Sequence, residues 1–121
     1  MLLAVVSSSA LAEWIKVSED KQGSPIYVNP TFSIRNGNIV DMSDLTDFNS
    51  AQTFNGAIYL SLKSQSQYDC KEELTREISE TGYSGNMGNG KSVFNFDVRE
   101  WHPVSPHNSS EILWKLACGK R

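Results

Sequence analysis

A glycine-rich segment around residue 90 has the residue types of a phosphate-binding loop. From Gly85 to Ser92 the chain reads Gly-Asn-Met-Gly-Asn-Gly-Lys-Ser, which matches the pattern Gly-x-x-x-x-Gly-Lys-Ser. In nucleotide-binding proteins the backbone amides of this pattern wrap the phosphates, the lysine neutralises charge and the serine holds magnesium. Such a loop opens a helix, whereas here the strand-like sequence Val-Phe-Asn-Phe follows. We therefore interpret the segment as a glycine-rich turn between strands and expect no nucleotide ligand.

The two histidines have side chains that could act as general bases or metal ligands. His102 and His107 flank Pro103 and Pro106, and neither has a partner at the spacing of a catalytic triad or a three-ligand metal site. We interpret both as surface or loop residues. The sequence thus predicts no catalytic residue, no metal site and no cofactor, and it does not assign ligand-binding residues.

Three aspartates recur at a spacing of three residues: Asp41, Asp44 and Asp47. Carboxylates close together could bind a cation, but a calcium loop needs alternate oxygen ligands and a glycine at its bend. We interpret the three aspartates as a solvated strand edge.

The chain has two cysteines, Cys70 and Cys118. An even number of cysteines is typical of an oxidising compartment, and these two form one possible pair. Their bond would close a loop of about 49 residues and, by chain entropy, destabilise the unfolded state by roughly 4 kcal/mol. Two unrelated buried thiols are the alternative; a metal site lacks the usual Cys-x-x-Cys or histidine cluster.

The first twelve residues resemble the C-terminal part of a secretory signal peptide. An apolar stretch ends in Ala-Leu-Ala, and the polar Glu13 follows at once, so we expect cleavage between Ala12 and Glu13. The apolar part is short and no basic residue precedes it, so the signal itself is expected to be incomplete. The alternative is a strand or frayed terminus of a cytosolic protein. No cysteine lies near the cleavage point, so we expect export to the periplasm or exterior without a lipid anchor.

The composition indicates one soluble domain, which we place at residues 13–121. A chain of 121 residues suits a single hydrophobic core, and 39% of its residues are apolar. The formal charge of −3 comes without a basic cluster, so the electrostatic footprint of nucleic-acid binding is missing. No stretch approaches the ~20 apolar residues of a transmembrane helix.

Short apolar runs separated by turn residues predict an antiparallel sheet of about five to six strands. Phe32 and Ile34 alternate with polar residues before Asn36-Gly37, a pair that favours a tight hairpin turn. Further strands are expected in residues 14–17, 26–28, 39–42, 57–63 and 93–98.

One helix is expected at the C-terminal end, capped by Ser109 or Ser110 and ended by Gly119. The stretch from Lys71 to Glu80 has both helical propensity and an alternation that suits a strand, so its residues do not decide between the two.

Four short motifs together resemble the surface-adhesin protein E family of Gram-negative bacteria. They are Tyr68-Asp69-Cys70, Tyr83-Ser84-Gly85-Asn86-Met87-Gly88-x-Gly90, Trp101-x-Pro103-Val104-x-Pro106 and Ser110-Glu111-x-Leu113-Trp114-x-x-x-Cys118. The resemblance implies a compact antiparallel sheet with one helix, a disulfide between Cys70 and Cys118, and mostly strand from Tyr68 to Ser84. The named member of that family is a lipid-anchored adhesin that binds host proteins, but no lipidation cysteine follows the signal here.

The leading hypothesis is an exported, non-enzymatic binding protein that is adhesin-like by resemblance. Its expected partner is a host extracellular or periplasmic protein. The first alternative is a periplasmic housekeeping or inhibitor-type protein with a partner from the same organism. The second is a small exported hydrolase, which a concave pocket holding a carboxylate of shifted pKa would favour.

Overall fold

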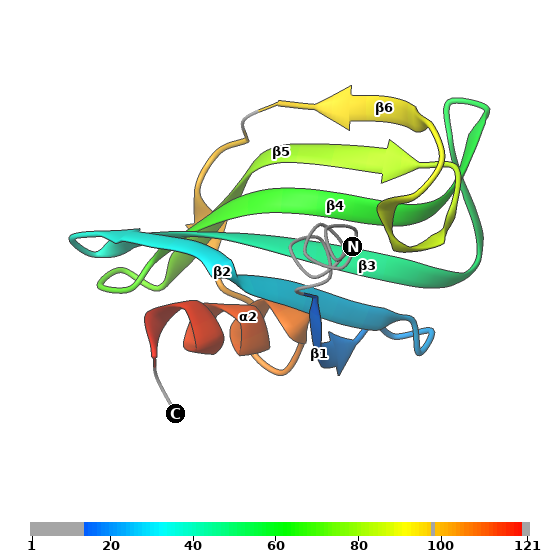
Figure 1. The fold of residues 1–121 in the computed structure, drawn as a ribbon. Helices are drawn as coiled ribbons and strands as arrows, with labels where there is room; N and C mark the ends of the chain where they lie inside the picture. Colours follow the sequence, from blue (N-terminus) through cyan, green and yellow to red (C-terminus); the bar gives the residue numbers. More distant parts are fainter. Residues whose placement is uncertain (1–13, 98, 120–121) are drawn as a thin grey trace, which may run out of the picture.

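The computed structural model describes residues 14–97 and 99–119. Within them the chain forms a seven-stranded antiparallel sheet and one α-helix (Figure 1). The elements are β1 (Ile15–Glu19), β2 (Pro25–Asn36), β3 (Ile39–Phe54), β4 (Ala57–Asp69), β5 (Leu74–Tyr83), the 3-10 turn η1 (Asn86–Gly88), β6 (Ser92–Phe96), β7 (His102–Pro103) and α2 (Ser109–Cys118). The predicted signal segment and its cleavage point, Ala12 and Glu13, lie outside the described residues.

Strand order in the sheet follows the chain from β1 to β6, and the two-residue β7 pairs with the start of β5. The predicted mainly β fold with one C-terminal helix is confirmed. The strand count exceeds the expected five to six because β7 is too short to have its own sequence pattern.

Two tight turns join the three longest strands. In the predicted hairpin between β2 and β3, Asn36 pairs with Ile39, so the turn residues are Gly37 and Asn38. Among the described residues of this turn, the positive φ falls on Gly37 alone, at 67°. The turn is therefore not of type I′, which needs positive φ at both central positions. That geometry occurs instead between β3 and β4, where Asn55 and Gly56 have φ of 50° and 81°.

The stretch from Lys71 to Glu80 is a turn followed by a strand. Glu73 has a φ of 57° and interrupts any helix, and β5 begins at the next residue. From there β5 pairs with β4 over nearly its whole length, from Leu74 opposite Asp69 to Tyr83 opposite Ser61. Pairing with a long neighbouring strand outweighs the local helical propensity. The family resemblance predicted this strand correctly.

Helix α2 packs on one face of the sheet and completes the core. The buried residues there come from β2, β3, β4 and the helix: Ile26, Val28, Val40, Met42, Tyr68, Cys70, Leu113, Trp114 and Cys118. The indole Nε1 of Trp114 donates a hydrogen bond to the carbonyl oxygen of Asp69 at 2.9 Å. This contact fixes the helix against the end of β4.

A disulfide joins Cys70, directly after β4, to Cys118 in the last turn of α2. The two Cα atoms are 5.5 Å apart, and the described residues contain no free cysteine. The predicted disulfide is confirmed. The bond ties the C-terminal end of the helix to the sheet.

The N-cap of the helix lies one residue before Ser109 and two before Ser110, the two predicted caps. Asn108 is the N-cap, and its side-chain oxygen accepts a hydrogen bond from the backbone N–H of Ser110 at 2.8 Å. The prediction of Ser109 or Ser110 is wrong because an asparagine at this position caps as well as a serine. Gly119, with φ of 68°, ends the helix as predicted.

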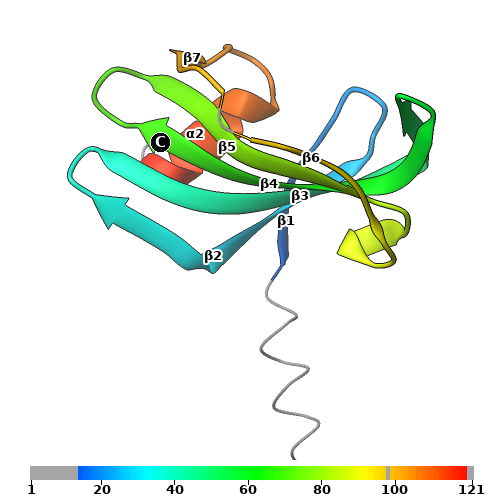
Figure 2. The same ribbon diagram turned by 90° about the horizontal axis from the view of Figure 1, so that it is seen from above.

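At the end of the sheet away from the disulfide, aromatic rings of β3, β4 and β6 pack together. The β3–β4 hairpin bends toward the side of the sheet on which α2 lies (Figure 2), and its rings meet those of β6. The five rings are Phe48, Phe54, Tyr59, Phe94 and Phe96, with centroid separations of 4.8–5.7 Å. Gly82 of β5 makes room for this cluster, since a Cβ there would lie 2.2 Å from Cε2 of Phe94.

Candidate functional site

The two faces of the sheet differ in what covers them. Helix α2 lies on one face, which we call the helix face, and the η1 loop lies on the other, which we call the open face (Figure 2). Each face carries one feature that could bind a ligand: a polar groove on the open face and an acidic cavity on the helix face.

The N–H groups of the glycine-rich loop donate hydrogen bonds to side chains of the sheet. The carboxylate oxygen Oδ1 of Asp47 accepts hydrogen bonds from the backbone N–H of Met87 at 2.8 Å and from the side-chain amide of Asn86 at 2.9 Å. The hydroxyl of Ser61 accepts from the N–H of Gly88 at 2.8 Å and donates to the carbonyl of Gly85 at 2.7 Å. The backbone N–H groups of Met87 and Gly88 are thus already bound by an aspartate and a serine of the sheet.

The same loop covers the sheet. Ser61 and Leu45 on the open face are both fully buried beneath it. The loop connects β5 to β6, so the prediction of a glycine-rich turn between strands is confirmed.

A row of polar side chains crosses the open face at the opposite end of the sheet. Asp41, Gln67 and Arg76 are direct neighbours on β3, β4 and β5. Gln67 donates from Nε2 to Oδ1 of Asp41 at 3.0 Å, and its Oε1 accepts from Nε and Nη2 of Arg76 at 3.0 and 2.8 Å. The guanidinium of Arg76 stacks on the ring of Trp101, 4.6 Å from its centroid. These contacts hold four side chains in fixed positions.

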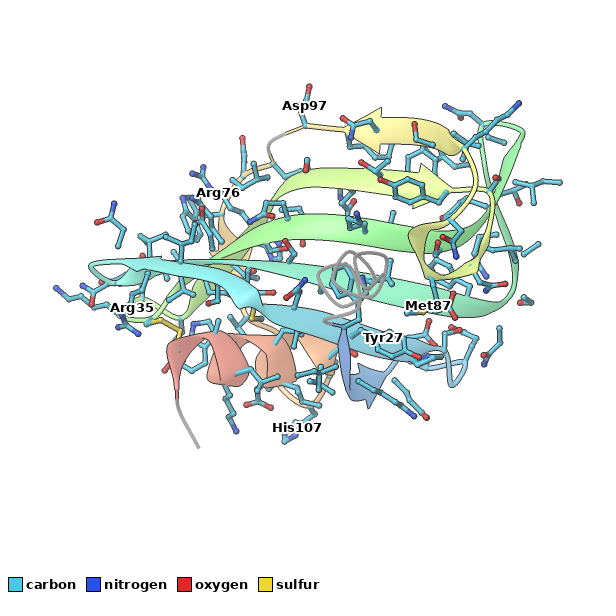
Figure 3. All side chains as sticks on the ribbon, in the orientation of Figure 1. Tyr27, Arg35, Arg76, Met87, Asp97 and His107 are labelled. Atoms are coloured by element: carbon cyan, nitrogen blue, oxygen red, sulfur yellow. A yellow bond between two sulfur atoms is a disulfide. The ribbon has the colours of Figure 1, made fainter. Side chains whose placement is uncertain are left out.

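The row forms one wall of a groove of about 360 Å³, which Ile34, Asn36 and Ile39 complete. Ile34 is 65% exposed, which is unusual for a large apolar side chain. Figure 3 shows Arg76 and Met87 at opposite ends of the sheet, so the groove and the glycine-rich loop are separate features of the open face.

The acidic cavity lies on the helix face and has a volume of about 200 Å³. Its lining includes Asp44, Glu77 and Glu80, from β3 and β5. Burial raises the pKa of Asp44 from 3.8 to about 8, and the charges of Glu80 and Glu77 add to the rise. Burial also raises the pKa of Glu80, against the opposing effect of the Arg99 guanidinium.

The prediction of a solvated aspartate edge is wrong for Asp44, which is only 8% exposed. Strand β3 is central, with β2 and β4 on its two sides, so it is not an edge. Because side chains alternate along a strand, Asp44 points to the helix face while Asp41 and Asp47 point to the open face. The spacing of three therefore separates these carboxylates instead of gathering them.

The histidines are exposed, as predicted. His102 of β7 has its Nε2 3.6 Å from Oε1 of Glu77, at the outer side of the acidic cavity. His107 lies in the turn before α2, where its backbone N–H donates to Glu111. Within the described ranges, no three metal-ligating side chains of the His, Cys, Asp and Glu types gather in one place. Within the same ranges no helix is both long enough and apolar enough to cross a membrane.

The sequence did not reveal either feature. Gln67 and Arg76 stand nine residues apart and become neighbours only through the register of β4 and β5, which hairpin loop length and bulges set. Asp44 and Glu80 likewise share a cavity only across two strand pairings. The alternation of Ser64, Ser66 and Tyr68 was the one available signal, since small hydroxyls on the inner face of a strand leave room for a cavity.

Comparison with known proteins identifies the family. A family model described as surface-adhesin protein E matches residues 14–119. A crystal structure of Haemophilus influenzae protein E has a TM-score of 0.71 at 10% identity, over 89% of this chain and 88% of that one. Another, from non-typeable H. influenzae, has a TM-score of 0.65 at 11% identity, over 89% and 76%. At these identities the structures show a shared fold, and no curated protein matches the sequence. Since the family match spans most of its length, the chain belongs to the surface-adhesin protein E family.

Proposed function

We propose that the protein is an exported binding domain that holds a protein partner in the groove of its open face. The family is one of surface adhesins and not an enzyme family, which supports a binding role at or beyond the cell surface. The observation that carries the proposal is the fixed row of Asp41, Gln67, Arg76 and Trp101 beside the exposed Ile34.

This row has the properties of an interface centre. Tryptophan and arginine are the residue types that most often dominate binding energy, and here each holds the other in place. Side chains that are ordered before binding lose less entropy when the partner arrives. The exposed Ile34 adds apolar surface at the edge of the groove.

A binding assay on whole cells and matrix tests the proposal. Purified, fluorescently labelled protein is added to cultured epithelial cells and to the extracellular matrix that they deposit. Arg76→Ala and Trp101→Ala should each reduce binding about ten-fold or more. Lys115→Ala, which removes an exposed charge on the helix, is the matched control and should bind as the parent does. Circular dichroism confirms that all three variants are folded.

The assay also distinguishes the origin of the partner. Retention of a partner from a periplasmic extract, with no binding to cells or matrix, would support the housekeeping or inhibitor alternative. Equal binding by all variants would show that the partner contacts a different surface and would contradict the role of the groove.

The hydrolase alternative rests on the acidic cavity, because Asp44 has the shifted pKa that such an enzyme would use. The described residues of the cavity do not form a well-placed pair of a nucleophile and its base. The only close pair is Ser64 with Oε2 of Glu80 at 3.5 Å, which is the outer limit of a hydrogen bond, and Glu80 is already paired with Arg99 at 2.6 Å. We therefore assign the cavity to binding and not to catalysis.

A further inference from the structure

The acidic cavity on the helix face contains a buried carboxyl group without a donor. Asp44 is 8% exposed and lines the cavity, and no hydrogen bond joins its carboxyl group to another described residue; since no fully buried side-chain oxygen of the described residues lacks a partner, this carboxyl faces the cavity space. Burying a carboxyl without a hydrogen bond costs free energy, which a donor entering the cavity would recover.

The charges around the cavity are unbalanced. Glu77 and Glu80 face Asp44 from β5, and Tyr68 faces it from β4. At the outer side, Arg99 pairs with Glu80 at 2.6 Å and His102 with Glu77 at 3.6 Å. Helix α2 contributes only Ser110 and Leu113 to the lining, and neither titrates. One permanent positive charge therefore stands against three carboxyl groups, so the cavity favours a cation.

The lining suits an organic cation better than a metal ion. Among the described residues no three carboxyl or imidazole groups come together closely enough to bind a metal. The acceptors are spread around a space of about 200 Å³, and hydroxyls such as Ser64 and Ser66 alternate with apolar walls at Leu62 and Leu113. A primary ammonium has three N–H donors, and its alkyl chain fits apolar walls.

We infer that this cavity binds a primary ammonium group on a short alkyl chain, with Asp44 as its counter-ion. The ammonium group belongs either to a free aliphatic amine or to a lysine side chain of another protein. The inference is independent of the groove on the open face, because the two sites lie on opposite faces of the sheet.

Binding of a cation to this site releases a proton. In the empty cavity Asp44 keeps its proton at neutral pH, since burial raises its pKa to about 8. An ammonium beside Asp44 stabilises the ionised form, so at pH 7 binding of the ammonium drives a proton off Asp44.

Titration calorimetry on the full chain tests the inference with two probes. n-Butylammonium chloride represents a free amine, and Nα-acetyl-lysine N-methylamide represents a lysine within a protein. Each is titrated at pH 7 in phosphate and in HEPES, which carry no primary ammonium group and whose different heats of ionisation report the number of protons released. We expect saturable binding of at least one probe with proton release. The probe that binds identifies the source of the ammonium group.

Two variants and two further probes make the test specific. Asp44→Asn keeps the shape of the protonated side chain but cannot ionise, and it should weaken binding about ten-fold or more and abolish proton release. Asp97→Asn, which removes the same charge from an exposed position just after β6, is the matched control and should bind as the parent does. n-Butanol, which lacks the charge, should not bind. Lack of binding by both ammonium probes, equal binding to Asp44→Asn, or preference for calcium chloride over both probes would overturn the inference.

Discussion

The buried Asp44 gives a quantitative prediction about stability and pH. Its folded-state pKa is raised from 3.8 to about 8, mainly by burial. Between these two values the folded state therefore holds more protons than the unfolded state, and the free energy of unfolding falls as the pH rises. Asp44→Asn has nearly the same shape as the protonated aspartate and does not titrate. The variant should be more stable than the parent at neutral pH, with a gain that grows as the pH rises.

The size of this gain follows from the pKa difference. Each unit corresponds to about 1.36 kcal/mol, so the penalty carried by Asp44 has an upper bound of roughly 4 kcal/mol at pH 7. Between pH 5 and pH 8 the advantage of the variant should grow by roughly 3 to 4 kcal/mol. This is a large share of the ~5 to 15 kcal/mol that stabilises an ordinary domain.

Urea denaturation, followed by tryptophan fluorescence at several values between pH 5 and pH 8, measures the effect. Asp97→Asn, which removes the same charge from an exposed position just after β6, is the matched control. If the curves of the parent and Asp44→Asn run parallel over this pH range, Asp44 is ionised in the folded protein. The reasoning from burial would then be wrong.

Two further substitutions test the ends of the sheet. Replacing both Cys70 and Cys118 by serine removes a crosslink with a sequence separation of 48. The free energy of unfolding, measured by urea denaturation, should fall by roughly 4 kcal/mol. A loss below about 1 kcal/mol would show that the unfolded chain without the disulfide is already conformationally restricted. Gly82→Ala places a methyl group against the ring of Phe94, and it should cost about 1 to 3 kcal/mol and lower the thermal midpoint. An unchanged midpoint would mean that the aromatic cluster rearranges freely.

The predictable part of the fold came from short-range patterns. Alternation placed strands at residues 57–63 and 93–98, where the structure has β4 and β6 (Ser92–Phe96), and apolar spacing with a terminal glycine placed the helix. These patterns depend only on residues that are close along the chain, so they can be recognised without knowledge of the tertiary structure. The two cysteines predicted a long-range contact because only one pair was available.

The unpredicted part depends on how the strands are aligned. Asp44 and Glu80 reach one cavity, and Asp41 and Arg76 one groove, because register shifts in the β2–β3, β3–β4 and β4–β5 pairings fix which residues are adjacent. A shift of one residue would send every side chain to the other face. The sequence alone could not set this alignment, so it could not separate a buried aspartate from two on the open face.

The chain-order pairing of strands has a consequence for how the protein is made. From β1 to β6 each strand pairs with the next one along the chain, so the sheet can grow one hairpin at a time as the polypeptide emerges. Helix α2 is the last element, and it contacts β1, the first. Until those last residues arrive, Tyr68 and the rest of the helix face remain uncovered and Cys70 has no partner. Oxidation can therefore join the two cysteines only after the sheet strands and α2 have been made, and the disulfide then keeps α2 on the helix face.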